Sequence, residues 1–200
     1  MPVKPYRLTR RSIIGTGLAA AAIGGNYARA QVTLGDLPDA ATGLGPAAPR
    51  PAPDLNFVSA AGKRLTLAGF RGAGLVVNIW ATWCGPCVAE LPSFAAIAPR
   101  LAASKILVLP ISIDEEGLKA VQPFYASHRI ANLPILLDPD GTVADTLGGP
   151  GIPITIVINP LGQIVARVDG AADWNTPATL ARLHHIAGTA AAPESGFQPV

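Results

Sequence analysis

Residues 75–87 read LVVNIWATWCGPC, and this stretch determines the predicted fold because it joins a buried strand to two cysteines. The run Leu75–Trp80 is apolar except for Asn78, which is typical of a strand buried on both faces. Two cysteines, Cys84 and Cys87, follow after a short turn. Because the strand ends just before them, we expect Cys84 to lie at the first turn of a helix.

The spacing of the two cysteines suits redox chemistry. A thiol at a helix N-terminus faces unpaired backbone N–H groups and the positive end of the helix dipole, which stabilise its thiolate. Cys87 follows on the same helical face, close enough to form a disulfide with Cys84. We therefore expect Cys84 to attack or be attacked and Cys87 to resolve the mixed disulfide. Pro86 fits the first helical turn, where its missing N–H removes no hydrogen bond.

Two other roles for the cysteine pair are weaker. A purely structural disulfide would close one of the shortest possible loops, whereas loop-closure stabilisation grows with loop length. A structural zinc site needs about four ligands. The chain has only 2 cysteines, and His128, His184 and His185 lack the usual ligand spacing. We expect no metal and no bound cofactor.

Predicted strands and helices alternate through the central region. Strands are predicted at 56–58, 64–67, 106–113, 133–137, 154–158 and 163–168, and helices from 84 to about 103, from 114 to about 128 and from 176 to about 187. Asp114, Glu115 and Glu116 supply a predicted N-cap and acidic first turn for the second helix. This alternation predicts an α/β fold with helices on both faces of the sheet.

The charge of the chain is unevenly distributed. Half of the 200 residues are hydrophobic and 14% are charged, which is typical of a globular protein. Residues 1–30 hold 5 of the 15 basic residues and no acidic residue, so the remainder has 10 basic against 13 acidic residues. This negative remainder disfavours nucleic acid as a partner.

Residues 1–30 are predicted to be a signal peptide. A basic start ends at Arg10-Arg11, an uncharged stretch follows, and Ala28-Arg29-Ala30 has the small-x-small form of a cleavage site. Residues 9–14 resemble the twin-arginine export motif. The apolar core is shorter than the about 20 residues of a spanning helix. We expect export to the periplasm, with the leader either cleaved or kept as a membrane tether.

The leader is followed by three predicted segments. Residues 31–53 are rich in Pro, Ala and Gly without apolar periodicity, which predicts a linker. Residues 54–188 form the predicted folded domain, and residues 189–200 are a predicted flexible tail. One folded domain therefore carries the cysteine pair.

The chain resembles the thioredoxin superfamily, and within it the exported TlpA/ResA-like thiol–disulfide oxidoreductases. The likeness covers roughly residues 54–187 and is carried by residues 76–87, Glu90-Leu91-Pro92, Gly151 to Thr155, the hairpin 159–168, Gly170 and Trp174. It implies a thioredoxin-like fold, with a central mixed sheet, helices on both faces, an N-terminal β-hairpin and an inserted strand/helix element.

The resemblance also implies roles for residues around the cysteines. Pro153 is expected to be cis and to face the pair, while Ile152 offers backbone groups to an extended substrate segment. Trp83 is expected to be an apolar platform for partners. Gly85 and Pro86 match the dipeptide of reducing thioredoxins, which favours reduction of substrates over their oxidation. These five residues are the expected substrate-binding positions.

Two residues, Asn78 and Glu90, bear on proton transfer to and from the inner cysteine, Cys87. Ordinary thioredoxin keeps a buried Asp on the strand before the cysteines, whereas Asn78 here cannot act as a general base and is expected to be a hydrogen-bonded core group. Glu90, one helical turn after Cys87, would shuttle protons near neutrality if it is partly buried, and the exported subfamily carries a Glu there. The alternative is a surface glutamate favoured by the helix dipole.

Together these features predict a periplasmic protein thiol–disulfide oxidoreductase with Cys84, Cys87 and Glu90 as catalytic residues. The resemblance implies protein substrates with disulfides or cysteine pairs, such as apocytochrome c or copper-site cysteines, and a membrane thiol carrier as electron donor. An alternative is a copper chaperone with the thiols as ligands. Copper-delivering relatives, however, space their cysteines by three residues and add a late His.

Overall fold

The computed structural model describes Thr33 and residues 37–45 and 47–188. The predicted signal peptide (1–30) and tail (189–200) lie outside the described residues. In the described part of the chain, no helix is both long enough and apolar enough to cross a bilayer.

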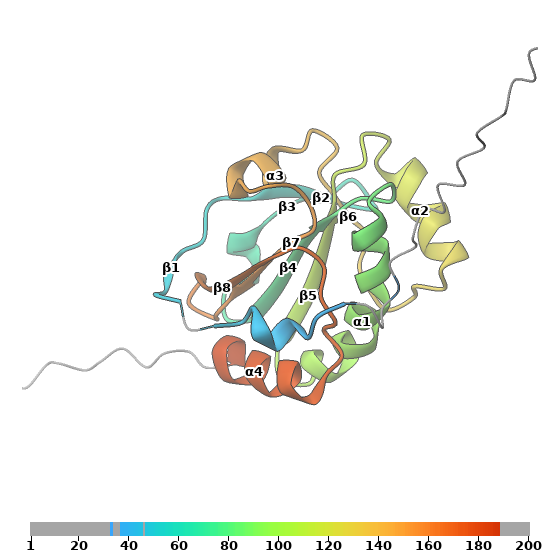
Figure 1. Ribbon diagram of the computed structural model, residues 1–200. Helices are drawn as coiled ribbons and strands as arrows, with labels where there is room; N and C mark the ends of the chain where they lie inside the picture. Colours follow the sequence, from blue (N-terminus) through green and yellow to red (C-terminus); the bar gives the residue numbers. More distant parts are fainter. Residues whose placement is uncertain (1–32, 34–36, 46, 189–200) are drawn as a thin grey trace, which may run out of the picture. The chain divides into compact units, whose positions relative to one another are not determined.

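A mixed sheet of eight strands runs through the centre of the domain (Figure 1), in the order β1-β8-β7-β4-β5-β6-β2-β3. The strands are β1 (Arg50–Pro51), β2 (Asn56–Ser59), β3 (Arg64–Thr66), β4 (Gly74–Trp80), β5 (Ile106–Ser112), β6 (Leu136–Leu137), β7 (Ile154–Ile158) and β8 (Gln163–Asp169). The helices are α1 (Gly85–Ala102), α2 (Leu118–Ser127), α3 (Thr142–Leu147) and α4 (Pro177–Gly188), with short 3-10 helices η2 (Ala40–Thr42) and η3 (Leu67–Phe70).

Strand β4 lies in the middle of the sheet. It pairs in parallel with β5 and antiparallel with β7, and both predicted hairpins, β2–β3 and β7–β8, are present. The sheet is therefore mixed, as the resemblance implied. Because β4 has a strand on each side, its backbone groups have partners in both neighbours. All seven of its residues are buried, since both faces of the sheet are covered.

The apolar run of β4 is divided between two cores. Val76 and Trp80 belong to one hydrophobic cluster, and Leu75, Val77 and Ile79 belong to the other. This division follows from the period of two in a strand, where successive side chains point to opposite faces. A continuous apolar run is thus what a central strand with two covered faces requires.

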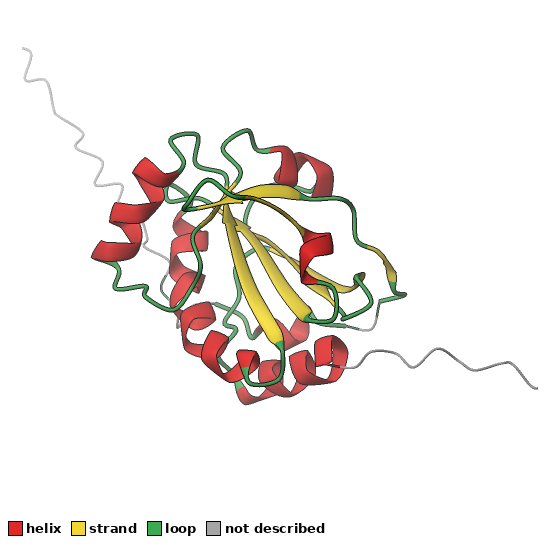
Figure 2. Ribbon diagram, turned by 180° about the vertical axis from the view of Figure 1, so that it is seen from behind, coloured by secondary structure: helices red, strands yellow, loops and turns green. Residues whose placement is uncertain are grey.

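Helices cover both faces of the sheet, as predicted. Buried residues of α1, α2 and α4 join the cluster that contains Trp80. On the other face, Phe57 of β2, Leu67 of η3 and Val143 of α3 join the second cluster. Figure 2 shows the strands crossing the centre of the domain with the helices around them.

The described part of the predicted linker, 31–53, is packed against the domain, which corrects that prediction. Leu44 is 1% exposed and joins the core. The carboxylate of Asp39 accepts hydrogen bonds from the hydroxyl groups of Thr176 and Thr179, at the start of α4. Strand β1 pairs with β8. A segment without apolar periodicity is thus held by a few specific contacts with distant residues.

The predicted cap of the second helix is also corrected. Helix α2 begins at Leu118 with Gly117 at its N-cap, in a left-handed conformation with φ of 55°. The carboxylate of Asp114 instead accepts hydrogen bonds from Thr82 N at 3.0 Å and from the hydroxyl groups of Thr82 and Ser112. Asp114 therefore joins the end of β5 to the turn before the cysteines.

The region 133–147 differs from the prediction in two ways. The predicted strand 133–137 is reduced to β6, Leu136–Leu137. Helix α3, which was not predicted, begins directly after Gly141, and Asp138 accepts a hydrogen bond from Val143 N at 2.7 Å at its start. Six residues are too few to show a helical hydrophobic period.

Candidate active site

Cys84 and Cys87 form a disulfide at the start of α1, with their Cα atoms 5.3 Å apart. Cys84 is the N-cap residue, and its Sγ accepts a hydrogen bond from Cys87 N at 3.3 Å. Gly85 and Pro86 open the helix. Strand β4 ends at Trp80, so the structure places Cys84 where the sequence predicted it.

The two sulfur-bearing residues differ in their access to solvent. Cys84 is 7% exposed, whereas Cys87 is 0% exposed. Trp83, Gly85 and Pro86 around Cys84 are all exposed, and Trp83 is exposed to 68%. A partner can therefore approach the pair only from the side of Cys84.

The Ile152–Pro153 peptide bond is cis and lies beside the disulfide. The carbonyl oxygen of Ile152 is 3.7 Å from Sγ of Cys84. Strand β7 begins at the next residue and pairs with β4 at Ile79, which brings this loop beside the turn that carries Cys84. The structure thus brings Ile152 and Pro153 to the cysteine pair, as the resemblance implied.

Glu90 is fully buried, so the alternative of a surface glutamate is wrong. Its Oε1 accepts a hydrogen bond from Asn78 Nδ2 at 2.8 Å. Its Oε2 accepts hydrogen bonds from Ala172 N and Trp174 Nε1, each at 3.2 Å. The carboxylate lies one turn after Cys87 in α1 and points into the same core as that cysteine.

Burial controls the protonation of Glu90. Loss of hydration raises the pKa of this carboxyl from 4.5 to about 7, although the hydrogen bonds from Trp174, Ala172 and Asn78 act in the opposite direction. The raised pKa means that Glu90 exchanges a proton near neutral pH. A pKa near 7 is compatible with a proton shuttle, and this role of Glu90 stays a prediction.

Asn78 is a buried hydrogen-bonded residue, as expected. Besides its bond to Glu90, Nδ2 donates to Thr155 Oγ1 at 3.0 Å. No described residue donates to its Oδ1, which is buried. Both acceptors of Nδ2 lie on the face of the sheet that is covered by α1, where the period of two places Asn78 between Val76 and Trp80.

Sequence reasoning did not identify the groups that hold the second oxygen of Glu90. Trp174 was noted as part of the resemblance, but its bond to Glu90 spans 84 positions. The Trp174 ring stacks on Phe94 with the ring centroids 4.9 Å apart. Ser93 fixes the same region, since its hydroxyl donates to Glu90 O and accepts from Trp174 N.

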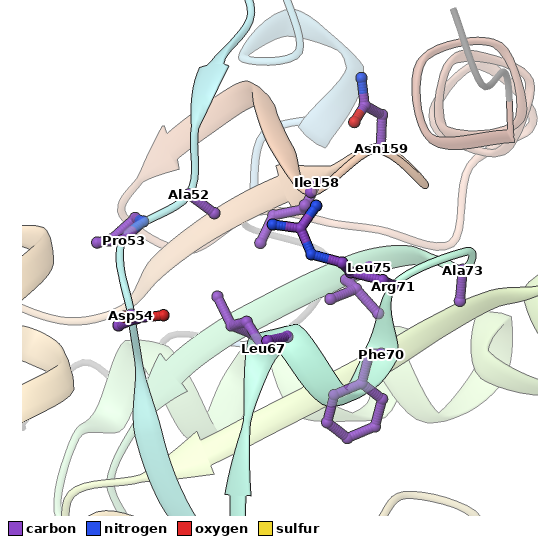
Figure 3. A pocket seen from close by; sticks show the side chains of 12 residues that line it. Ala52, Pro53, Asp54, Leu67, Phe70, Arg71, Ala73, Leu75, Ile158 and Asn159 are labelled. Carbon is purple, nitrogen blue, oxygen red and sulfur yellow. The ribbon is translucent and has the colours of Figure 1, made fainter.

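A small hollow of ≈ 40 Å³ lies beside the start of β4, whereas the cysteines follow the end of that strand. Figure 3 shows the side chains that line it. Leu67, Leu75 and Ile158 line it, and the side chain of Arg71 reaches across it. The Arg71 guanidinium donates to Leu161 O at 2.9 Å. The arginine is thus used to hold a turn, and the hollow is separate from the disulfide.

Within residues 37–45 and 47–188, no three His, Cys, Asp or Glu side chains gather as metal ligands would. The copper-chaperone alternative would therefore have only the sulfurs of Cys84 and Cys87 as ligands in the described part of the chain.

Comparison with known proteins points to one kind of chemistry. The profile of the AhpC/TSA family matches residues 49–167. The thiol:disulfide interchange protein DsbE of Pseudomonas aeruginosa is 33% identical over 138 residues, which cover 69% of this chain and 72% of that protein. The thiol-disulfide oxidoreductase ResA of Bacillus subtilis is 33% identical over 119 residues, 60% of this chain and 65% of that protein.

A solved structure with a similar fold is the exposed lipoprotein thioredoxin Etrx1 of Streptococcus pneumoniae. It aligns with a TM-score of 0.56 and 26% identity, and the alignment covers 66% of this chain and 99% of that one. The thioredoxin-like fold inferred from the sequence is therefore confirmed.

Proposed function

The chain belongs to the AhpC/TSA family and is a thioredoxin-like thiol–disulfide oxidoreductase, and from this premise we propose that it reduces disulfides of exported proteins in the periplasm. The observation that carries the proposal is the unequal exposure of the two cysteines, 7% for Cys84 and 0% for Cys87. It allows a substrate to reach one sulfur and keeps the other for the second step.

The proposed reaction has two steps. In the reduced protein, the Cys84 thiolate attacks one sulfur of a substrate disulfide, and the other substrate sulfur leaves as a thiolate. Cys87 then loses its proton and attacks Sγ of Cys84, which releases the second substrate thiolate. The substrate gains two electrons, and the protein returns to the disulfide form seen here.

Glu90 is proposed to accept the proton of Cys87 in the second step. Its pKa of about 7 makes the ionised form available near neutrality, and its position one turn after Cys87 places it on the inner side of the pair. When the protein is reduced again, Glu90 returns the proton. Cys87 and Glu90 are both 0% exposed, which supports a proton transfer that is shielded from the substrate.

Five residues around Cys84 are proposed to bind the substrate. Ile152, which is partly exposed, presents a backbone carbonyl beside the sulfur, and the buried Pro153 follows it. Trp83, Gly85 and Pro86 form the rest of the surface that a protein must touch to reach Cys84. Their open position supports this role.

Location and partners are proposed from the sequence. The basic leader, the twin-arginine pattern and the alanines of the cleavage site support export. The name of the pneumococcal neighbour, an exposed lipoprotein, agrees with a location outside the cytoplasm. We propose cytochrome c or metal-site cysteines as substrates and a membrane thiol carrier as donor.

Reduction of insulin disulfides in the presence of a small dithiol tests the activity. The wild-type protein is expected to accelerate insulin precipitation, and Cys84→Ser to abolish the effect. Cys87→Ser is expected to stop after the first step and accumulate a mixed disulfide through Cys84. Full activity of Cys84→Ser, or no trapped species with Cys87→Ser, would contradict the proposal.

The location and the substrates need a separate experiment. Cys87→Ser, expressed with its leader in bacterial cells, should accumulate mixed disulfides in the periplasmic fraction, and mass spectrometry of these species identifies the partners. Cys84→Ser/Cys87→Ser is the control without a trapping sulfur. Mixed disulfides confined to the cytoplasm would contradict the periplasmic assignment.

A further inference from the structure

A cleft of ≈ 530 Å³ opens beside the turn that carries the disulfide. One side is formed by Thr82 and Trp83, directly before Cys84. The other sides are formed by the loop after β5 and by residues 139–141. The cleft therefore borders the turn that a protein segment must approach to reach Cys84.

The cleft and the disulfide turn are joined by hydrogen bonds. The buried carboxylate of Asp114 accepts from Thr82 N at 3.0 Å and from Thr82 Oγ1 at 2.6 Å. A third bond comes from Ser112 Oγ at 2.7 Å. The loop after β5 is thus fixed to the residue two positions before Cys84, so the cleft is continuous with the surface that a substrate must touch.

The surface of the cleft combines an aromatic ring with negative charge. Trp83 is 68% exposed, and it is one of only two large apolar side chains exposed in the described part of the chain. Glu115, Glu116 and Asp140 are exposed around the same cleft, whose lining contains no Lys, Arg or His. None of the three carboxylates forms an ion pair with a described residue, although Lys119 is exposed nearby on α2.

We propose that this cleft binds a Lys- or Arg-bearing extended segment next to the reactive cysteine of the substrate. The proposal rests on the exchange reaction at Cys84 and names the class of protein that reacts best. The cationic group lies among the three carboxylates, while its aliphatic stem or guanidinium plane covers the indole of Trp83. A positive segment is favoured because opposite charges increase the rate of encounter.

The proposed preference for a positive segment depends on the charges next to Cys84 and not on the net charge of the whole protein. On the other side of Cys84, the loop before Pro153 lies beside Arg167, which is paired with Asp169 at 2.8 Å. Arg167 also donates to Leu147 O, and through Nη2 to Gly148 O. The arginine beside this loop is therefore paired, whereas the lining of the cleft holds carboxylates and no Lys, Arg or His, and the preference is expected to be a local one.

Two synthetic peptides test the proposal. Each has one cysteine, activated as a mixed disulfide with 2-thiopyridine, and the peptides differ only in two flanking residues, Lys in one and Gln in the other. Release of thiopyridone gives the second-order rate constant for attack by reduced Cys84. We expect the Lys peptide to react about fivefold to tenfold faster at low salt. The ratio should fall towards one between 0.01 M and 0.15 M salt, as the Debye length shrinks from about 30 Å to about 8 Å.

A pair of variants with equal change in net charge separates the cleft from the whole protein. Glu115→Gln/Glu116→Gln removes two negative charges at the cleft and is expected to abolish most of the preference. Asp54→Lys changes the net charge by the same amount at an exposed site outside the cleft, and is expected to keep it. A ratio near one in the wild type, or an equal loss in both variants, would overturn the proposal.

The Gln peptide distinguishes this proposal from the exchange mechanism itself. It should react with similar rate constants in the wild type and in both variants, because the sulfur chemistry is unchanged. If no protein reacts with either peptide, the exchange at Cys84 is wrong. If the Gln peptide reacts and the Lys peptide has no advantage, only the cationic partner is wrong.

Discussion

The side-chain amide of Asn78 donates to Oε1 of Glu90 across 2.8 Å, at a position where neither residue is exposed. The bond joins the central strand β4 to helix α1, and it places a neutral donor where ordinary thioredoxin keeps an acid. The amide supports the ionised form of Glu90, while burial favours the neutral form. The balance leaves the pKa of Glu90 at about 7.

Glu90→Gln should remove a pH dependence of stability. The pKa of Glu90 is 4.5 without the fold and about 7 within it. Between these values the folded protein holds a proton that the unfolded chain has released, so stability falls as the pH rises from about 4.5 to about 7. The fall amounts to about 3 kcal/mol. Urea unfolding of the oxidised protein at pH 5 and pH 8 measures it.

The variant should fold because Asn78 can adapt to it. The one side-chain oxygen of Gln can accept the hydrogen bonds from Trp174 and Ala172, while its NH2 group faces Asn78. Rotation of the Asn78 amide would present Oδ1, which has no described donor in the present structure. A variant that loses stability between pH 5 and pH 8 as much as the wild type does would show that Glu90 is not the titrating group.

Trp174→Phe should destabilise the ionised form of Glu90. The change removes the Nε1 donor, 3.2 Å from Oε2, and leaves a ring that can still stack on Phe94. We expect a loss of about 2 kcal/mol at pH 8, because the bond is made to a charged group. At pH 5, where the carboxyl is protonated, the loss should be smaller. Urea unfolding at the two pH values gives the difference.

Trp80→Phe is the matched control. Trp80 is also fully buried, but its Nε1 has no hydrogen-bond partner among the described residues. The same change in ring size should therefore have an effect that does not depend on pH. Equal losses in the two variants at pH 8 and at pH 5 would mean that the bond from Trp174 to Glu90 does not stabilise the carboxylate.

Asn78→Asp should create a pair of buried acids that share a proton. The two carboxyl groups would stand where Asn78 Nδ2 and Glu90 Oε1 now lie 2.8 Å apart. Two negative charges so close repel each other strongly, so the apparent pKa of one of the groups rises further. We expect the variant to lose more stability than the wild type when the pH rises from 5 to 9. Carboxyl NMR titration of the oxidised protein should show two coupled steps. A single step with the wild-type midpoint would contradict this expectation.

Leu44→Ala should cost about 2–4 kcal/mol of the free energy of unfolding, as expected for a buried leucine. Leu44 is 1% exposed although the segment around it lacks an apolar pattern. Leu161→Ala is the control, because Leu161 is 44% exposed and should lose less than about 1 kcal/mol. Equally small losses in thermal and urea unfolding would show that residues 37–45 do not stabilise the domain.

Local signals predicted the centre of the fold well. The apolar run of β4, the turn before Cys84 and the hairpin β7–β8 are each specified by residues close in sequence. Each of these three features depends on residues that are close together in the sequence, so one sequence contains the information needed to place them. The cis bond before Pro153 was implied by the family resemblance and not by such local signals, and it is present.

Features that depend on distant partners were not predicted. Asp114 has the composition of a helix cap, but Thr82, 32 positions earlier, supplies its donors. Asp39 lies in a stretch with the composition of a linker, but its carboxylate accepts a hydrogen bond from the hydroxyl of Thr179, 140 positions later. Periodicity and capping patterns describe neighbours in sequence, and they cannot say which distant side chain completes a hydrogen bond.

The hydrogen-bond partners of Glu90 come from 12, 82 and 84 positions along the chain. In an unfolded chain the Glu90 carboxyl would lack these partners and behave like that of an ordinary glutamate, whether or not the cysteines form a disulfide. The carboxyl frequency of this one side chain, read by infrared difference or by isotope-labelled NMR, is therefore a built-in reporter of maturation. It reaches its native value only when Ala172 and Trp174, in the C-terminal part of the chain, have also bonded to Glu90.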